Sequence, residues 1–245
     1  MRARSVFAPR RFMRLLLSDA MSIRRDPMLA LAIALSTTPA LAMLRAREMM
    51  DVAALERLGV MDFSRYVAPV ALLIPAFLIG WVTGFLLLED RDDGPLLAVD
   101  VTPVGKVGFL WYRVTATAAV VLVLTLGASI TVTPQLGAGR RLAAAVMVAA
   151  AAVLAAIILP AVARNKVEGL ALTKLTNLAS IVPLLAMVPS PWRYAAGIIP
   201  TYWLGELLAP PELRPLPLPW LLLTALASHV YWTVRLLARL RQRVG

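Results

Sequence analysis

Long apolar stretches alternate with short polar ones along the chain. Five of these stretches are 17 to 24 residues long: residues 27–44, 67–88, 109–132, 142–163 and 218–234. Each is close to the roughly 20 residues that an α-helix needs to cross the hydrocarbon core of a bilayer. Because a water-soluble domain would instead hide its apolar residues in short amphipathic elements, the pattern predicts an all-α membrane protein.

The pattern changes between the fourth and the last of these stretches. Residues 175–188 are apolar over only 14 positions, and we count them as a fifth span. The apolar residues 194–208 contain a proline, two glycines and an acid, which is typical of a broken or re-entrant segment. The sequence therefore predicts six transmembrane helices with such a segment before the last. Its candidate gate residues are Pro200, Gly205 and Glu206.

Basic residues surround this bundle at both ends of the sequence. Seven arginines are interleaved with apolar residues over residues 1–26, where residues 12–23 can form an amphipathic helix on the membrane surface. We expect residues 1–26 to be a cytoplasmic arm, residues 27–237 the six-helix bundle, and residues 238–245 a basic cytoplasmic tail. Together they form a single transmembrane domain over residues 1–245.

The distribution of Lys and Arg predicts the orientation, because cytoplasmic loops carry the excess of positive charge. With six spans and both termini inside, the cytoplasmic side holds 17 of the 25 basic residues and the other side holds 8. Counting residues 194–208 as a seventh span would reduce this ratio to 14 against 11. Six spans are therefore the better prediction.

Composition and charge exclude several other classes of protein. The net charge is +11, but the basic residues flank the apolar stretches and no basic groove with interleaved aromatic residues is visible. We therefore expect contact with the lipid bilayer and no nucleic acid as a partner. The chain has no cysteine, so it can form neither disulfides nor thiolate metal sites. Its one histidine, His229, lies within the last apolar stretch and is interpreted as a packed residue.

No catalytic motif is present in the sequence. It has no phosphate-binding loop, no HExxH and no GxSxG motif. The four acids among residues 89–93 resemble a solvated loop more than a cation site, so we expect no metal and no cofactor. The interiors of the first four spans hold no ionisable residue that could form an ion pathway. Energy for transport would have to come from a partner that contacts residues 89–106 and 164–174.

Four groups of residues, taken in their order along the chain, carry a resemblance to a known family. Residues 24–29, with the sequence RRDPML, open the first span, and residues 199–203, with the sequence IPTYW, lie in the broken segment. The loop after the second span contains Glu89, Gly94, Leu97, Thr102, Pro103 and Lys106. The loop after the fourth contains Asn165, Lys166, Glu168, Gly169 and Lys174. This order resembles the ABC-2 class of ATP-binding-cassette permeases, in particular the bacterial drug-export permeases of fluoroquinolone-export type.

The resemblance implies a half-sized permease in the bacterial plasma membrane. Such a permease pairs with a second permease, either the same chain or a sister chain, and with two ATPase subunits that bind ATP and Mg²⁺. It exports an amphipathic drug-like or lipid-like molecule by alternating access. Residues 89–106 would contain the coupling helix, and residues 164–174 would make a second ATPase contact. The sequence departs from the family pattern around Gly94, where Asp92, Asp93 and Pro95 replace small polar residues.

Other functions remain open from the residues alone. The chain could be a non-transporting membrane scaffold that recruits a cytoplasmic partner, and its two polar loops could be plain solvated turns. The broken segment could be a lid that only shields the outer end of the bundle. A membrane enzyme acting on lipid fits less well, because general acids and bases are not clustered.

Overall fold

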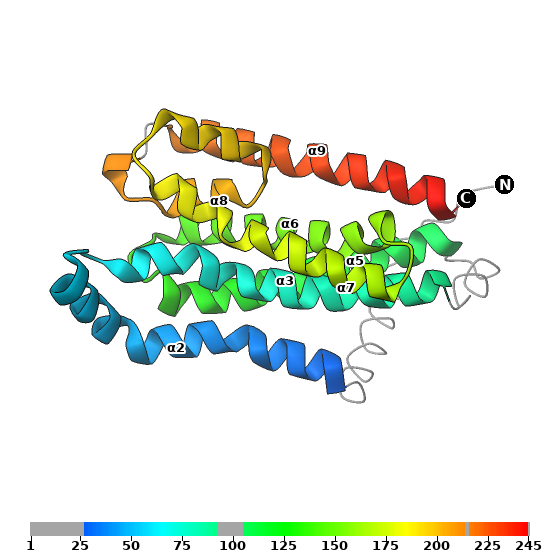
Figure 1. Ribbon diagram of the computed structural model, residues 1–245, viewed down its shortest axis with the longest axis horizontal. Helices are drawn as coiled ribbons and strands as arrows, with labels where there is room; N and C mark the ends of the chain where they lie inside the picture. The colour runs from blue at the N-terminus through cyan, green and yellow to red at the C-terminus, as the bar shows by residue number, and fades with distance from the viewer. Residues whose placement is uncertain (1–26, 93–104, 214–215, 245) are drawn as a thin grey trace.

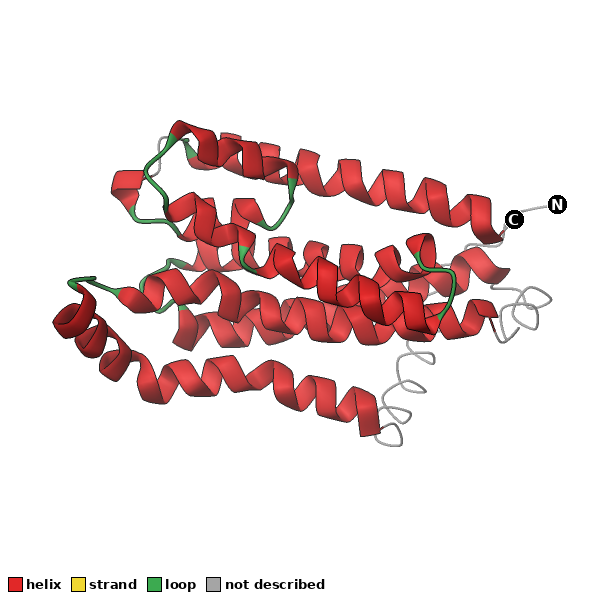
Figure 2. Ribbon diagram, in the orientation of Figure 1, coloured by secondary structure: helices red, strands yellow, loops and turns green. Residues whose placement is uncertain are grey.

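The computed structural model describes residues 27–92, 105–213 and 216–244, and this part of the chain contains helices and no strand (Figure 2). The all-α prediction is therefore confirmed there. The amphipathic arm, residues 1–26, lies outside the described residues. The α-helices are α2 (Pro27–Leu58), α3 (Phe63–Asp92), α5 (Gly105–Val132), α6 (Ala138–Val162), α7 (Lys166–Thr176), α8 (Tyr202–Leu208) and α9 (Leu218–Val244). Short 3₁₀ segments are η1 (Asn177–Ser180), η2 (Val182–Met187), η3 (Pro191–Ile198) and η4 (Pro211–Leu213).

Five helical segments among the described residues are long and apolar enough to cross a membrane. They are Phe63–Asp92, Val107–Val132, Ala138–Val162, Lys166–Met187 and Leu218–Gln242. They correspond to the second to sixth predicted spans, and the fifth is formed by α7, η1 and η2 together. The first predicted span, residues 27–44, forms the first part of α2 and is not among the five.

Several helices extend beyond the predicted spans, into the charged sequence around them. The helix α2 continues through Arg45 and Arg47 to Leu58, and α9 continues through the basic tail to Val244. The helix α7 begins at Lys166, so most of the predicted loop 164–174 is helical. Charged side chains delimit the apolar span but do not end a helix, because Arg, Lys and Glu are good helix formers.

The alanine-rich α6 is the centre of the bundle and packs against α3, α5 and α9. Its alanines allow α3 to approach closely at Gly80, where an added Cβ would lie 2.7 Å from the Cβ of Ala155 and 2.8 Å from the oxygen of Ala152. Ala152 itself is fully buried. Small side chains on both helices therefore allow α3 and α6 to pack closely.

The bundle has two ends, which we call proximal and distal (Figure 1). At the proximal end α2, α5 and α7 begin, and α3, α6 and α9 finish. At the distal end lie the connection from α2 to α3, the turn from α5 to α6, and the short helices between η2 and α9. The two loops predicted to couple to an ATPase therefore start at the same end of the molecule.

Between η2 and α9 the chain forms a hairpin at the distal end. The segment η3 runs from this end toward the middle of the bundle, the chain turns at residues 199–201, and α8 runs back (Figure 1). The hairpin packs against η2, α3, α6 and α9. The predicted break in residues 194–208 is confirmed, and its cause is visible in the sequence, since Pro200 cannot continue a hydrogen-bonded helix.

Candidate functional site

The first residues of the two predicted coupling loops meet at the proximal end. Glu89 lies in the last turn of α3, and Lys166 is the first residue of α7. The Nζ atom of Lys166 donates a hydrogen bond to Oε1 of Glu89 at 3.0 Å, and both side chains are about half exposed. Two segments 77 residues apart in sequence are thus joined by an ion pair that a partner protein can reach.

A second residue of α3, Arg91, fastens the end of this helix to the end of α6. Its Nη1 donates to the carbonyl oxygens of Pro160 at 2.9 Å and Ala163 at 3.1 Å, and its Nη2 donates to the carbonyl of Arg164 at 3.0 Å. The last carbonyls of a helix have no partner within it, and a cation there is favoured by the helix dipole. We call Glu89, Arg91, Lys166 and their partners the proximal corner.

The turn from α6 to α7 is held by its own side chains. The side chain of Asn165 accepts a hydrogen bond from the backbone of Glu168 at 2.9 Å, and the Glu168 carboxylate accepts one from the backbone of Arg164 at 2.7 Å. This reciprocal arrangement resembles a capping box, in which two side chains satisfy backbone N–H groups at the start of a helix. A Cβ on Gly169 would lie 3.1 Å from a methyl of Leu88, so this glycine allows α7 to lie directly on α3.

The remaining predicted coupling residues are distributed differently. Lys174 is exposed two turns farther along α7. Lys106 belongs to the first turn of α5. Gly94, Leu97, Thr102 and Pro103 lie outside the described residues. The structure therefore brings Glu89 together with the residues at the start of α7, and Arg91 is the contributor that sequence reasoning missed.

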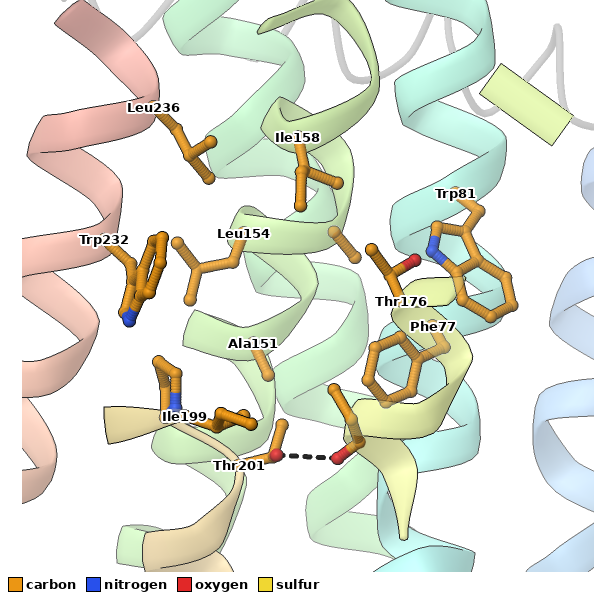
Figure 3. A pocket seen from close by; sticks show the side chains of 13 residues that line it. Phe77, Trp81, Ala151, Leu154, Ile158, Thr176, Ile199, Thr201, Trp232 and Leu236 are labelled. Carbon is orange, nitrogen blue, oxygen red and sulfur yellow. Dashed lines mark hydrogen bonds between the residues drawn. The ribbon is translucent and has the colours of Figure 1, made fainter. Parts of the chain in front are cut away.

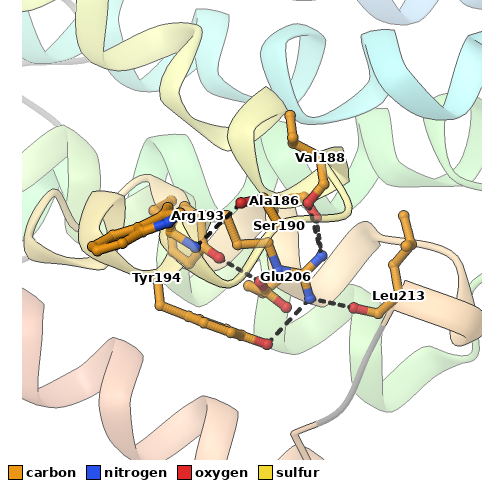
Figure 4. Close-up of polar contacts among 9 residues, drawn as sticks. Ala186, Val188, Ser190, Arg193, Tyr194, Glu206 and Leu213 are labelled. Carbon is orange, nitrogen blue, oxygen red and sulfur yellow. Dashed lines mark hydrogen bonds and ion pairs between the residues drawn. The ribbon is translucent and has the colours of Figure 1, made fainter.

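A buried ion pair organises the distal hairpin (Figure 4). Nε of Arg193, in η3, lies 3.3 Å from Oε1 of Glu206, in α8, and the side chains are 6% and 0% exposed. The guanidinium also donates to the carbonyl of Ala186 at 2.9 Å and to the carbonyl of Leu213. The hydroxyl of Tyr202 donates a short hydrogen bond to the same Glu206 oxygen. One cation thereby connects η2, η3, α8 and η4.

The three predicted gate residues have distinct positions in this hairpin. Glu206 is the partner of Arg193, which the sequence alone did not single out. Gly205 lies so close to η2 that a Cβ would collide with the carbonyl oxygen of Pro183. Pro200 lies in the turn and lines an apolar cavity that is partly open to the outside.

That cavity has a volume of about 180 Å³ and apolar walls (Figure 3). Its walls come from α3, α6, the junction of α7 and η1, the hairpin turn and α9. Two hydrogen bonds fix the turn that closes its distal side: Thr201 Oγ1 donates to the carbonyl of Ala179 at 2.6 Å, and Trp232 Nε1 donates to the carbonyl of Ile198 at 2.7 Å. Within the part of the chain that the structure describes, no group of three His, Cys, Asp or Glu residues could hold a metal.

Comparison with known proteins places these features in a family. The family described as Fluoroquinolones export permease protein Rv2686c-like matches residues 19–237. Two relatives from Mycobacterium tuberculosis, the fluoroquinolones export permease proteins MT2760 of strain CDC 1551 / Oshkosh and Rv2686c of strain H37Rv, are each 31% identical over 147 residues. The match covers 55% of this chain and 58% of each relative. No solved structure matches the chain.

Proposed function

The chain belongs to the Rv2686c-like family of fluoroquinolones export permeases, and we propose that it is the membrane subunit of an ATP-driven exporter. Its relatives are named as fluoroquinolones export permease proteins. We therefore assign it a drug-like or lipid-like amphipathic substrate. The chain supplies the membrane pathway, and separate subunits of the ATP-binding-cassette class bind ATP and Mg²⁺ and hydrolyse the nucleotide.

We propose six spans with both termini in the cytoplasm of a bacterial cell. The first part of α2 adds a sixth helix to the five apolar ones, and it begins at the proximal end, where α9 finishes. An even number of spans agrees with this shared end. The excess of Lys and Arg on the predicted inner side, 17 against 8, makes the proximal end cytoplasmic.

The observation that carries the proposal is the proximal corner. Because Arg91 fastens α3 to α6 and the Glu89–Lys166 pair fastens α3 to α7, a force applied to either predicted coupling segment acts on three helices together. Closure of two ATPase subunits beneath this end would move these helices as one body, which is the motion that alternating access requires. A half-sized permease needs a second permease, the same chain or a sister chain, to complete the pathway.

The distal hairpin is the proposed gate. The segment α7–η1–η2 runs from the proximal corner to the hairpin, where Pro183 of η2 touches Gly205 of α8. A displacement of α7 would therefore be transmitted to α8 through η1 and η2. Irregular backbone at membrane depth is tolerated where protein buries it or where it lines a water-filled path, and both conditions apply at a gate.

Charge reversal at the corner tests this function. Glu89→Lys and Lys166→Glu should each leave the chain inserted and folded, because an exposed ion pair contributes only about 0.2–1 kcal/mol. Each should reduce drug export into inverted vesicles by at least severalfold relative to ATP hydrolysis. The double reversal restores the pair between α3 and α7 and should recover export if the pair acts by joining the helices.

The matched control is Glu56→Lys, which reverses an exposed acid in the distal part of α2 and should export normally. Normal export by both single variants would remove the corner from the coupling mechanism. A chain that copurifies with a cytoplasmic partner but transports nothing in the wild-type form would instead support the scaffold alternative.

A further inference from the structure

The apolar cavity and a second hollow nearer the proximal end lie one after the other along α6, and we call the two together the groove. On α6, Ala151, Leu154, Ala155 and Ile158 line the cavity, and Ala161 and Val162 line the second hollow. Ala151, Ala155, Ile158 and Val162 follow one another at spacings of four, three and four, and Leu154 and Ala161 lie beside them. The six residues therefore form one stripe along a single face of the helix. The two hollows therefore lie over the same face of α6.

The helix α9 forms one wall of both hollows. Trp232 and Leu236 line the cavity, and Arg239 and Gln242 line the second hollow. Trp232 and Arg239 are seven residues apart, which is two helical turns, so they project from the same face. The junction of α7 and η1 forms the opposite wall at Thr176 and Ala179 (Figure 3).

The length of the groove matches one leaflet of a bilayer. From Ala151 to Val162 the floor rises over 11 residues, which is about 16 Å at about 1.5 Å per residue. Half of a hydrocarbon core of roughly 30 Å is about 15 Å. Ala151 lies at the middle of α6 and Trp232 near the middle of α9, so the groove runs from the bilayer centre to the proximal surface.

The groove is closed at the centre and basic at its mouth. The hairpin turn closes the inner end through the hydrogen bond from Thr201 to Ala179. The hydroxyls in the walls are already used, since Thr176 also donates to a backbone carbonyl, that of Leu172. The indole nitrogen of Trp81 is buried without a hydrogen-bond partner and is the one free donor among the described wall residues. At the mouth the polar side chains are Arg239 and Gln242, and α9 contains no acidic residue.

We propose that this groove binds an anionic phospholipid, with one acyl chain against α6 and the phosphate at Arg239. An apolar channel that opens at the membrane surface is not a site for water, which needs two to four polar partners. A drug-like molecule needs several convergent polar groups to orient it, and the single buried indole nitrogen of Trp81 does not supply them. An acyl chain needs no polar partner in the groove. A guanidinium pairs with phosphate through two parallel hydrogen bonds, so Arg239 suits the headgroup.

The bound acyl chain would fill the space between α7 and α9. The helix α7 starts at the proximal corner. Only the assignment to the cytoplasmic leaflet rests on the proposed orientation of the permease. The binding site itself depends on the walls of the groove.

The test is native mass spectrometry of the full chain, extracted gently with its copurifying subunits and mixed with equal amounts of phosphatidylglycerol and phosphatidylcholine. We expect one retained phosphatidylglycerol per chain. Arg239→Gln should lower the preference for phosphatidylglycerol about fivefold, the usual effect of one basic residue near a lipid headgroup. Arg241→Gln is the matched control, because it removes an exposed arginine of α9 that does not line the groove.

A second pair of variants tests the acyl chain. Leu154→Phe fills the groove and should reduce retention of both phospholipids, whereas Val146→Phe, at an exposed position of the same helix, should leave it unchanged. If Leu154→Phe does not fold, the two arginine variants still decide the result. Equal effects of Arg239→Gln and Arg241→Gln, or a wild-type chain that retains no phospholipid, would overturn the proposal. Since retention is read without transport, neither result depends on whether the chain exports a drug.

Discussion

Replacement of Arg193 by Met should loosen the distal hairpin strongly. The change removes the cation that neutralises Glu206, whose side chain is 0% exposed, together with the donor to the carbonyls of Ala186 and Leu213. Breaking a buried ion pair by removing one partner costs about 3–5 kcal/mol. We expect this loss in the local stability of the hairpin rather than in that of the helix bundle.

The absence of cysteine makes a thiol-labelling assay clean. A reporter at Ala209→Cys, fully buried directly after α8, reacts with maleimide only when the hairpin opens. A loss of 3–5 kcal/mol corresponds to labelling that is roughly 150 to 5,000 times faster, at about 1.36 kcal/mol per factor of ten. A second reporter at Ala144→Cys, buried within α6, should keep its wild-type rate and thereby show that the bundle is intact.

A double variant separates the stranded charge from the lost hydrogen bonds. Arg193→Met combined with Glu206→Leu leaves no buried charge, and apolar replacement of a whole buried pair is often close to neutral. Its labelling should be slower than that of Arg193→Met alone. Wild-type labelling in Arg193→Met, or a double variant that labels as fast as the single one, would refute the importance of the pair.

Three further predictions follow from packing, topology and assembly. Gly80→Ala should lower the free energy of unfolding by about 1–3 kcal/mol, because the new Cβ meets Ala155 and Ala152. Gly127→Ala, where a Cβ meets open space, should raise it by up to about 1 kcal/mol. Thermal unfolding in detergent measures both variants, and shifts of the unfolding temperature in the same direction would contradict this prediction. In intact cells an impermeant maleimide should label Arg57→Cys and not Arg243→Cys, and labelling of position 243 would refute cytoplasmic termini. The mass of the gently extracted complex should correspond to two permease and two ATPase chains, and a transport-active particle with one permease would disprove the pairing.

The spans were predictable because a bilayer fixes their length and composition. The residues at which the helices begin and end were harder to predict. The fifth span looked too short from residues 175–188, since its first turns carry Lys166, Glu168 and Lys174, which the hydropathy pattern excludes. In the structure those turns are helical, capped by Asn165, and complete a segment of 22 residues. The pair Asn165 and Glu168, three residues apart, was a cap signal that could have placed this helix start correctly.

Some residues of the candidate sites could be identified from the sequence and others could not, for a physical reason. Glu206 was recognisable because an acid in an apolar segment is costly unless it has a partner. The partner, Arg193, is 13 residues away across a turn whose path depends on tertiary packing. Arg91 was equally hidden, because its acceptors are backbone carbonyls of residues 160–164, and every residue type has such a carbonyl. Tertiary hydrogen bonds to backbone carbonyls therefore cannot be predicted from the residue types of the acceptors.

The route from the proximal corner to the hairpin contains one segment that can deform. The helix α7 is regular, but η1 and η2 are 3₁₀ turns, whose hydrogen bonds are less favourable than those of an α-helix and which often mark hinges. Thr201 is tied to Ala179 of η1, and Gly205 touches Pro183 of η2, so both contacts to the hairpin come from the deformable part. In the proposed mechanism a shift of α7 would therefore change the shape of η1 and η2, and this change, rather than the motion of a rigid rod, would reach the gate.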